Sequence, residues 1–124
     1  MPSQEHNTQH EKINYVEFQS SDFDKTKAFF GVVFGWTFVD YGSDYVAIDN
    51  AGIDGGFYYS EKTASAANGS VLIVFYSEDL KQTRDRIIDN GGTITQPIFD
   101  FPGGRRFHFN DLTGNEFAVW SDQV

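Results

Sequence analysis

The 124-residue sequence contains no cysteine, which excludes thiol catalysis, thiolate metal ligands and disulfide bonds. Histidine is scarce: of three residues, His6 and His10 lie in a polar stretch at the start of the chain, which leaves only His108 elsewhere. Basic residues number 9 against 18 acidic ones, so the formal net charge is −9. Phosphate backbones and anionic lipids repel such a chain, so we expect neither nucleic acid nor a membrane as a partner.

Long apolar runs are also missing, since none approaches the ~20 residues needed to span a bilayer. The start of the sequence lacks the basic and apolar segments of a signal peptide, which favours a cytoplasmic location. Residues 1–11 are polar and are expected to form a disordered tail. Aromatic side chains, in contrast, are abundant at 17% of residues. They suit a core as well as a pocket for an organic molecule.

The sequence contains an internal repeat. When it is shifted by 57 residues, the segment 20–27 falls on 77–84 with Ser, Asp and Thr at matching places, and Gly35 falls on Gly92. Such a repeat indicates two copies of one structural unit. We therefore predict a single domain over residues 12–124, with module one at 12–60, a linker at 61–69 and module two at 70–124.

Each module is predicted to contain a strand, a helix and three further strands. Apolar residues alternate in the predicted strands and recur every three or four positions in the predicted helices. Asp22 or Ser21 would cap the first helix, and Gly35 would end it. The fold class is therefore α+β, with two tandem βαβββ modules and the helices on one sheet face. The predicted strands are 13–19, 36–41, 45–50, 55–60, 71–76, 93–100, 105–109 and 116–120, and the second helix is 80–90.

Two segments carry a resemblance to a known family. INYVEFQSSDFDKTKAFFGVVFGW is similar to the opening strand, helix and Phe-Gly-Trp exit of the glyoxalase/bleomycin resistance protein/dioxygenase superfamily, also called the vicinal oxygen chelate family. GGRRFHFNDLTGNEFAVW resembles its final hairpin with an Asp-x-x-Gly turn. The resemblance covers nearly the whole chain after residue 12. It implies a curved, cup-like mixed sheet with the helices on its outer face, a pocket inside, and a homodimer.

The same resemblance bears on metal binding. Enzymes of the family hold a divalent metal through four side chains, commonly His, Gln or Glu. Those positions correspond here to Tyr15, Leu72, Ala118 and the segment 55–57. Leu, Ala and Gly side chains cannot bind a metal, and Tyr is a rare ligand. We therefore predict no metal and no other cofactor.

The strand faces opposite the helices are expected to line the pocket. Glu17 is the first candidate residue, because it places a carboxylate there. It could act as a general base or cation anchor, or form a structural hydrogen bond to a tyrosine or a backbone N–H. Tyr15 or His108 would be the acid, although His108 also fits a structural role in its strand. The predicted ligand-binding residues are Tyr15, Glu17, Gln19, Phe57, Leu72, Val74, Tyr76, Ala118 and Trp120.

Three functions fit this pattern. An aromatic and apolar pocket with one acidic side chain favours a metal-independent protein that binds a small organic molecule, aromatic or cationic. Tyr45, Phe57 and Tyr59 could close the mouth of that pocket, although the sequence does not determine which sheet face they occupy. The second possibility is a metal-independent lyase or isomerase that uses Glu17 as a general base. The third is a non-catalytic interaction module whose cavity is filled by its own side chains.

Overall fold

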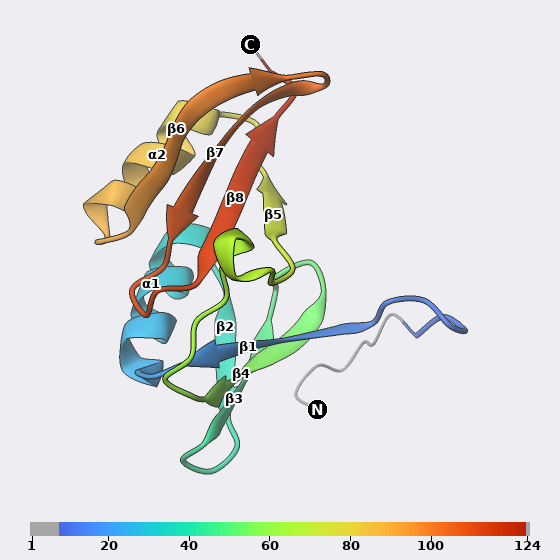
Figure 1. Ribbon diagram of the computed structural model, residues 1–124. Helices are drawn as coiled ribbons and strands as arrows, with labels where there is room; N and C mark the ends of the chain where they lie inside the picture. Colours follow the sequence, from blue (N-terminus) through green and yellow to red (C-terminus); the bar gives the residue numbers. More distant parts are fainter. Residues whose placement is uncertain (1–7, 124) are drawn as a thin grey trace. The chain divides into compact units, whose positions relative to one another are not determined.

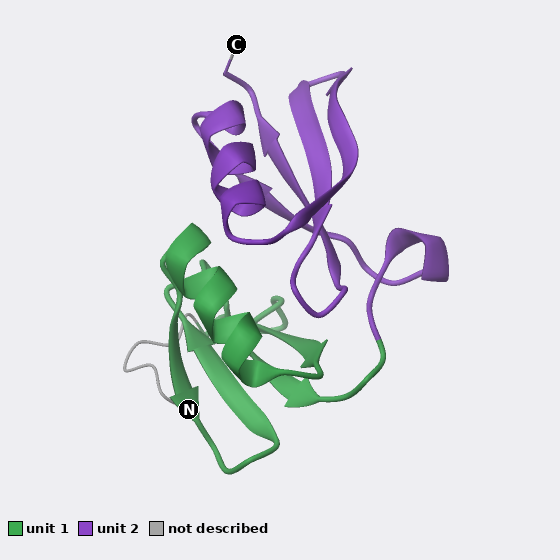
Figure 2. Ribbon diagram, turned by 90° about the vertical axis from the view of Figure 1, so that its left-hand side faces the viewer, with its two compact units in different colours: residues 1–62 green, residues 63–124 purple. Residues whose placement is uncertain are grey.

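The computed structural model describes residues 8–123 and divides the chain into two compact units, residues 1–62 and 63–124 (Figures 1 and 2). Each unit contains one four-stranded mixed sheet with a long helix against it. The division falls inside the predicted linker, residues 61–69. The α+β class and the βαβββ order of the elements are confirmed in both units.

Residues 1–7 and Val124 lie outside the described residues, so most of the predicted disordered tail, including His6, is not covered. His10, in the described part, is exposed. No helix among the described residues is long and apolar enough to cross a membrane.

The helix of the first unit begins at a residue whose side chain caps it and ends at a glycine. The Lys25 backbone N–H donates to the Asp22 carboxylate at 3.1 Å, which satisfies a donor of the first turn. Gly35 ends the helix with a left-handed φ of 75°. The strand order is β1-β4-β3-β2, with β1 parallel to β4. The elements are β1 (Tyr15–Ser20), α1 (Phe23–Phe34), β2 (Thr37–Asp40), β3 (Tyr45–Asp49) and β4 (Asp54–Tyr59).

The second unit repeats this topology, with the strand order β5-β8-β7-β6 and β5 parallel to β8. It also contains a short 3-10 helix, which falls inside the predicted linker. In Figure 1 the helix α2 lies against one face of the sheet. The elements are η1 (Ala66–Asn68), β5 (Ile73–Tyr76), α2 (Leu80–Asp89), β6 (Thr93–Phe101), β7 (Gly104–Asn110) and β8 (Glu116–Ser121).

The internal repeat reappears as one hydrogen-bond motif that joins each first strand to its helix. In the first unit the hydroxyl oxygens of Ser20 and Thr26 lie 2.8 Å apart, and the Asp22 N–H donates to Ser20 Oγ. In the second unit the hydroxyls of Ser77 and Thr83 lie 2.7 Å apart. All four hydroxyl-bearing residues are buried. The shared Ser, Asp and Thr positions therefore fix the strand-to-helix turn in both units.

The helix-facing side of each sheet forms a core of aromatic rings. The ring of Phe57 lies 5.1 Å from Phe18 and 5.7 Å from Phe30 of α1, and Phe57 has no exposed surface. The side chain of Phe57, one of the predicted ligand-binding residues, therefore points toward α1 and away from the helix-free face. In the second unit the core residues are Phe75, Phe107, Phe109, Phe117 and Ile87.

Candidate functional site

The helix-free face of the first sheet carries a cluster of polar and phenolic side chains. Tyr15, Glu17 and Gln19 alternate with the core residues of β1 and therefore share this face. Tyr45 of β3 reaches them because its ring lies across Gly56 of β4. A methyl group at Gly56 would lie 2.3 Å from the Tyr45 hydroxyl oxygen, so only glycine leaves room for the ring in this position. The strands at Gly56 pair in regular register.

Tyr45 links the acid and the first phenol of this cluster. Its hydroxyl donates to Glu17 Oε2 at 3.0 Å, and the hydroxyl oxygens of Tyr15 and Tyr45 lie 2.5 Å apart. Because a carboxylate only accepts, the Tyr45 proton is directed to Glu17 and Tyr15 donates to Tyr45. Burial above all, and then these two hydrogen bonds, raise the pKa of Tyr45 well above its usual 10.0. Tyr45 is therefore a proton donor in this cluster.

Glu17 itself is exposed, so its carboxylate is accessible to solvent. Beside it, Gln19 Nε2 donates to the Tyr58 hydroxyl at 2.9 Å. The first unit thus presents a carboxylate, two linked phenols and an amide on one open surface. Tyr59, which was expected near the mouth of the pocket, instead donates to Glu61 at 2.8 Å.

The helix-free face of the second sheet is built from two rows of side chains across strands β5, β8 and β7. Directly paired residues point to the same face. The first row contains Val74, Ala118 and His108, and the second contains Tyr76, Trp120 and Arg106. The rings of Tyr76 and Trp120 pack edge to face at 5.1 Å. An open hollow of about 430 Å³ lies on this face, lined by Val74, Phe101, Gly103, Arg106, Trp120 and Asp122.

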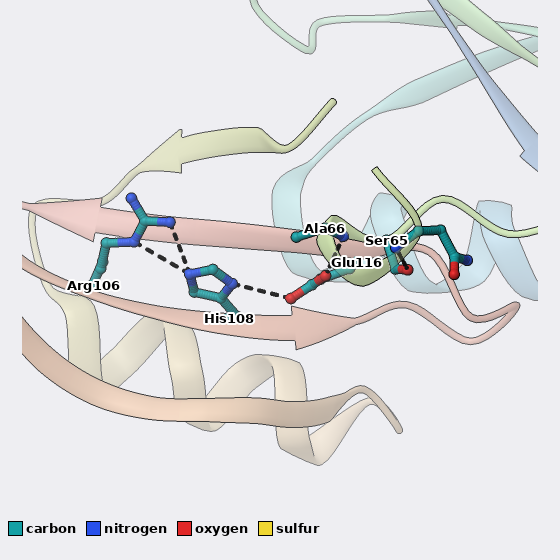
Figure 3. A network of polar contacts seen from close by, with 6 residues as sticks. Ser65, Ala66, Arg106, His108 and Glu116 are labelled. Atoms are coloured by element: carbon teal, nitrogen blue, oxygen red, sulfur yellow. Dashed lines mark hydrogen bonds and ion pairs between the residues drawn. The ribbon is translucent and has the colours of Figure 1, made fainter. Parts of the chain in front are cut away.

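A chain of hydrogen bonds runs from this hollow along the sheet (Figure 3). Arg106 Nη2 and Nε lie 2.8 and 3.3 Å from His108 Nε2, and His108 Nδ1 lies 3.1 Å from Glu116 Oε2. The Ala66 N–H donates to Glu116 Oε1 at 2.8 Å. A guanidinium can only donate, so His108 Nε2 accepts and Nδ1–H donates to Glu116. These hydrogen-bond roles are those of a neutral imidazole that carries its proton on Nδ1.

The two charged residues at the ends of this hydrogen-bond network, Glu116 and Arg106, have different surroundings. Hydrogen bonds from the Ala66 N–H and from His108 hold the pKa of Glu116 below its usual 4.5, against the opposing effect of burial. At the other end, the guanidinium carbon of Arg106 lies 5.7 Å from the ring centre of Phe99 and 5.9 Å from that of Phe101. These contacts hold Arg106 at the edge of the hollow.

The four positions that the resemblance assigns to metal ligands hold Tyr15, Leu72, Ala118 and the segment 55–57. Tyr15 is engaged with a second phenol, and Leu72 and Ala118 carry no ligand atom. The segment 55–57 offers two glycines and a buried phenylalanine. Within residues 8–123, no group of three or more His, Cys, Asp or Glu side chains is placed to hold a metal ion.

The predicted site residues fall into two separate sets, one in each unit. The predicted site residues that belong to strands lie on the helix-free faces, with the exception of Phe57. Leu72 lies just before β5, and Ala118 is buried on the helix-free face of the second sheet. Sequence reasoning did not select Tyr58 or Arg106. A signal for Arg106 was present, because it precedes His108 by two residues in a strand and therefore shares its face.

Comparisons with known proteins agree with this fold. The family model described as "Glyoxalase/Bleomycin resistance protein/Dioxygenase superfamily" matches residues 12–119. A fosfomycin resistance protein, FosX, from Listeria monocytogenes superposes with a TM-score of 0.75 at 19% identity, covering 94% of this chain and 97% of that one. A glyoxalase-related enzyme from Fulvimarina pelagi gives 0.74 at 14% identity, covering 90% and 88%. TioX from Micromonospora sp. ML1 gives 0.67 at 21% identity, covering 90% and 98%. No curated protein matches the sequence.

Proposed function

The chain belongs to the glyoxalase/bleomycin resistance protein/dioxygenase superfamily, and from that premise we propose that it binds a small organic molecule, aromatic or cationic, without a metal. The solved structures of similar fold include a fosfomycin resistance protein. Because one fold serves many activities, the proposal depends on the site residues of this chain.

The observation that carries the proposal is the exposure of large apolar and aromatic side chains around a few polar groups. On the helix-free face of the second sheet, Val74 and Tyr76 are 41% and 48% exposed. Contiguous apolar surface rimmed by polar groups is typical of binding sites. The hollow beside Trp120 provides a concave part of such a surface.

Glu17 is proposed as the contact for a cationic or hydroxyl group of the ligand. Its Oε2 accepts from Tyr45, while no hydrogen bond from a described residue reaches Oε1. An exposed carboxylate oriented by one phenol retains acceptor capacity for a ligand. The Tyr45 hydrogen bond thus orients the carboxylate and leaves it available.

A thermal-shift screen of aromatic and cationic metabolites tests this function. A ligand present at 100 times its dissociation constant should stabilise the protein by ~2.7 kcal/mol. Glu17→Gln should reduce the shift produced by cationic hits. Glu61→Gln is the matched control, because Glu61 is also an exposed carboxylate that accepts from a tyrosine hydroxyl. A broad library without hits, or cationic hits equally affected by both substitutions, would contradict the proposal.

Metal independence is tested separately. Binding of each hit should be unchanged after treatment with EDTA, and purified protein should contain no stoichiometric transition metal by elemental analysis. A tightly held zinc, nickel, iron or manganese ion coordinated by side chains of this chain would overturn this part of the proposal. We also propose a homodimer, for which sedimentation equilibrium should give twice the 14.0 kDa chain mass.

The hydrogen bonds between Tyr15, Tyr45 and Glu17 favour a second candidate function. It is a lyase or isomerase with Glu17 as general base and Tyr15 as acid. Tyr15, Tyr45 and Glu17 are joined by consecutive hydrogen bonds, so a proton could pass between Tyr15 and Glu17 through the Tyr45 hydroxyl. Hits from the screen should then be converted to products detectable by mass spectrometry. Glu17→Gln should abolish turnover, whereas Tyr58→Phe should preserve it. Hits that bind but are not converted to products would contradict the enzyme and support only the binding function.

A further inference from the structure

Arg106 carries a positive charge that no carboxylate of residues 8–123 neutralises at ion-pair distance. Its neighbour Arg105 differs, because Arg105 Nε lies 3.2 Å from Asp100 Oδ1. A guanidinium has five N–H donors. Two of them reach His108, and the other three meet no acceptor among the described residues. An uncompensated guanidinium with three available donors is suited to hold an anion.

The position of Arg106 is fixed before any ligand arrives. His108 accepts from two of its nitrogens, and the rings of Phe99 and Phe101 lie within cation–π distance of its guanidinium. His108 is 5% exposed and is itself held by Glu116. A guanidinium held in this way loses little side-chain freedom on binding, which favours affinity.

The hollow beside the guanidinium is largely apolar. Val74, Phe101 and Trp120 supply its apolar surface, and Asp122 also contributes to its lining. Aromatic rings bind flat organic groups by stacking and edge contacts. The carboxylate of Asp122 repels a doubly charged anion more strongly than a singly charged one, which favours a carboxylate ligand over a phosphate dianion.

We propose that this hollow in the second unit binds an aromatic monocarboxylic acid. The ligand carboxylate accepts hydrogen bonds from Arg106, and its ring lies against Trp120. The proposal rests on the proposed function for the general class of ligand, and it adds the charge, the acidic group and the contact residue. The proposed ligand of the second unit therefore differs in charge from that of the first unit, where Glu17 is the proposed contact for a cation.

Titration calorimetry with three probes that share one ring system tests the proposal: naphthoate, its isostere naphthamide, and naphthylmethylammonium. Naphthoate should bind at least about tenfold more tightly than naphthamide, as expected for charge-assisted hydrogen bonds. Arg106→Gln should bring the ratio close to one. Arg106→Lys retains the charge without the planar fork and should give an intermediate ratio. Arg105→Gln, the matched control, should preserve the wild-type ratio, since Arg105 is paired with Asp100.

Several outcomes would overturn the proposal: equal binding of naphthoate and naphthamide, tighter binding of the ammonium probe, no binding of naphthoate, or a carboxylate preference that survives in Arg106→Gln. Circular dichroism of each variant establishes that it is folded, and Arg106→Lys provides the result if Arg106→Gln is not. The proposed function fails separately, when the broad screen yields no ligand of any charge. A cationic hit sensitive to Glu17→Gln, together with no naphthoate binding, would refute only the inference about Arg106.

Discussion

Replacing Tyr45 with phenylalanine removes the hydroxyl that joins Tyr15 to Glu17 while keeping the ring over Gly56. A hydrogen bond to a charged group contributes about 1.5–3 kcal/mol and a neutral one about 0.5–1.5 kcal/mol. Glu17 is exposed, so water replaces part of what is lost. We therefore expect Tyr45→Phe to lower the free energy of unfolding by about 1–3 kcal/mol in urea denaturation at neutral pH.

The same phenol gives a pH-dependent prediction whose sign follows from its pKa. Because the pKa of Tyr45 is raised in the folded protein, the neutral phenol stabilises the fold below pH 10, and this stabilisation is lost as the pH rises through the raised value. In protein labelled with carbon-13 at the tyrosine ζ position, the signal that disappears in Tyr45→Phe identifies Tyr45. That signal should retain its neutral-phenol shift at pH ~11, well past the midpoint of an unfolded tyrosine. A midpoint at or below pH 10 would refute the hydrogen-bond assignment.

Further substitutions test other parts of the structure. Gly56→Ala should displace the Tyr45 ring, because its new methyl group would lie 2.3 Å from the hydroxyl, and the NMR titration midpoint of Tyr45 should fall. Thr83→Val should lower the free energy of unfolding by about 1–2 kcal/mol in urea, since it leaves the buried Ser77 hydroxyl without this partner. Glu116→Gln should flatten the acid limb of stability below pH 4.5 in a series of urea titrations. The lowered pKa of Glu116 means that its charged form stabilises the fold above that pH and loses this effect as the pH falls through the lowered value.

The elements were predictable from local chemistry. Asp22 capped α1 as expected, Gly35 ended it, and the repeat over 77–84 reproduced the same strand-to-helix turn in the second unit. These features depend on hydrogen bonds between residues close in sequence, so a pattern of residue types is enough to detect them. Strand and helix bounds differ from the predicted ones by at most two residues, as is usual where elements end.

The site was less predictable because its contacts join distant residues. Alternation placed Glu17 on the correct face, but its partner Tyr45 lies 28 positions away and reaches it only through the β3–β4 register. The face of Phe57 was left undetermined by the sequence for the same reason. Its face depends on pairing with Phe18, and a shift of one residue in register reverses every side chain of a strand.

The paired registers of the two sheets explain how one duplicated scaffold came to carry different chemistry. Tyr45 pairs with Tyr58 in the first sheet, as Arg106 pairs with Trp120 in the second, so the two occupy equivalent positions. Glu17 corresponds in turn to Val74, because each lies on the first strand of its unit at the position given by the repeat. At equivalent places one unit therefore has a phenol beside a carboxylate, and the other has a guanidinium beside an apolar side chain. The buried Ser and Thr pairs hold both turns in the same form, so the scaffold tolerates this divergence on the helix-free faces. Ligand selection in this chain must consequently be sought in those face residues, since the cores and turns that the two units share cannot distinguish a cation from an anion.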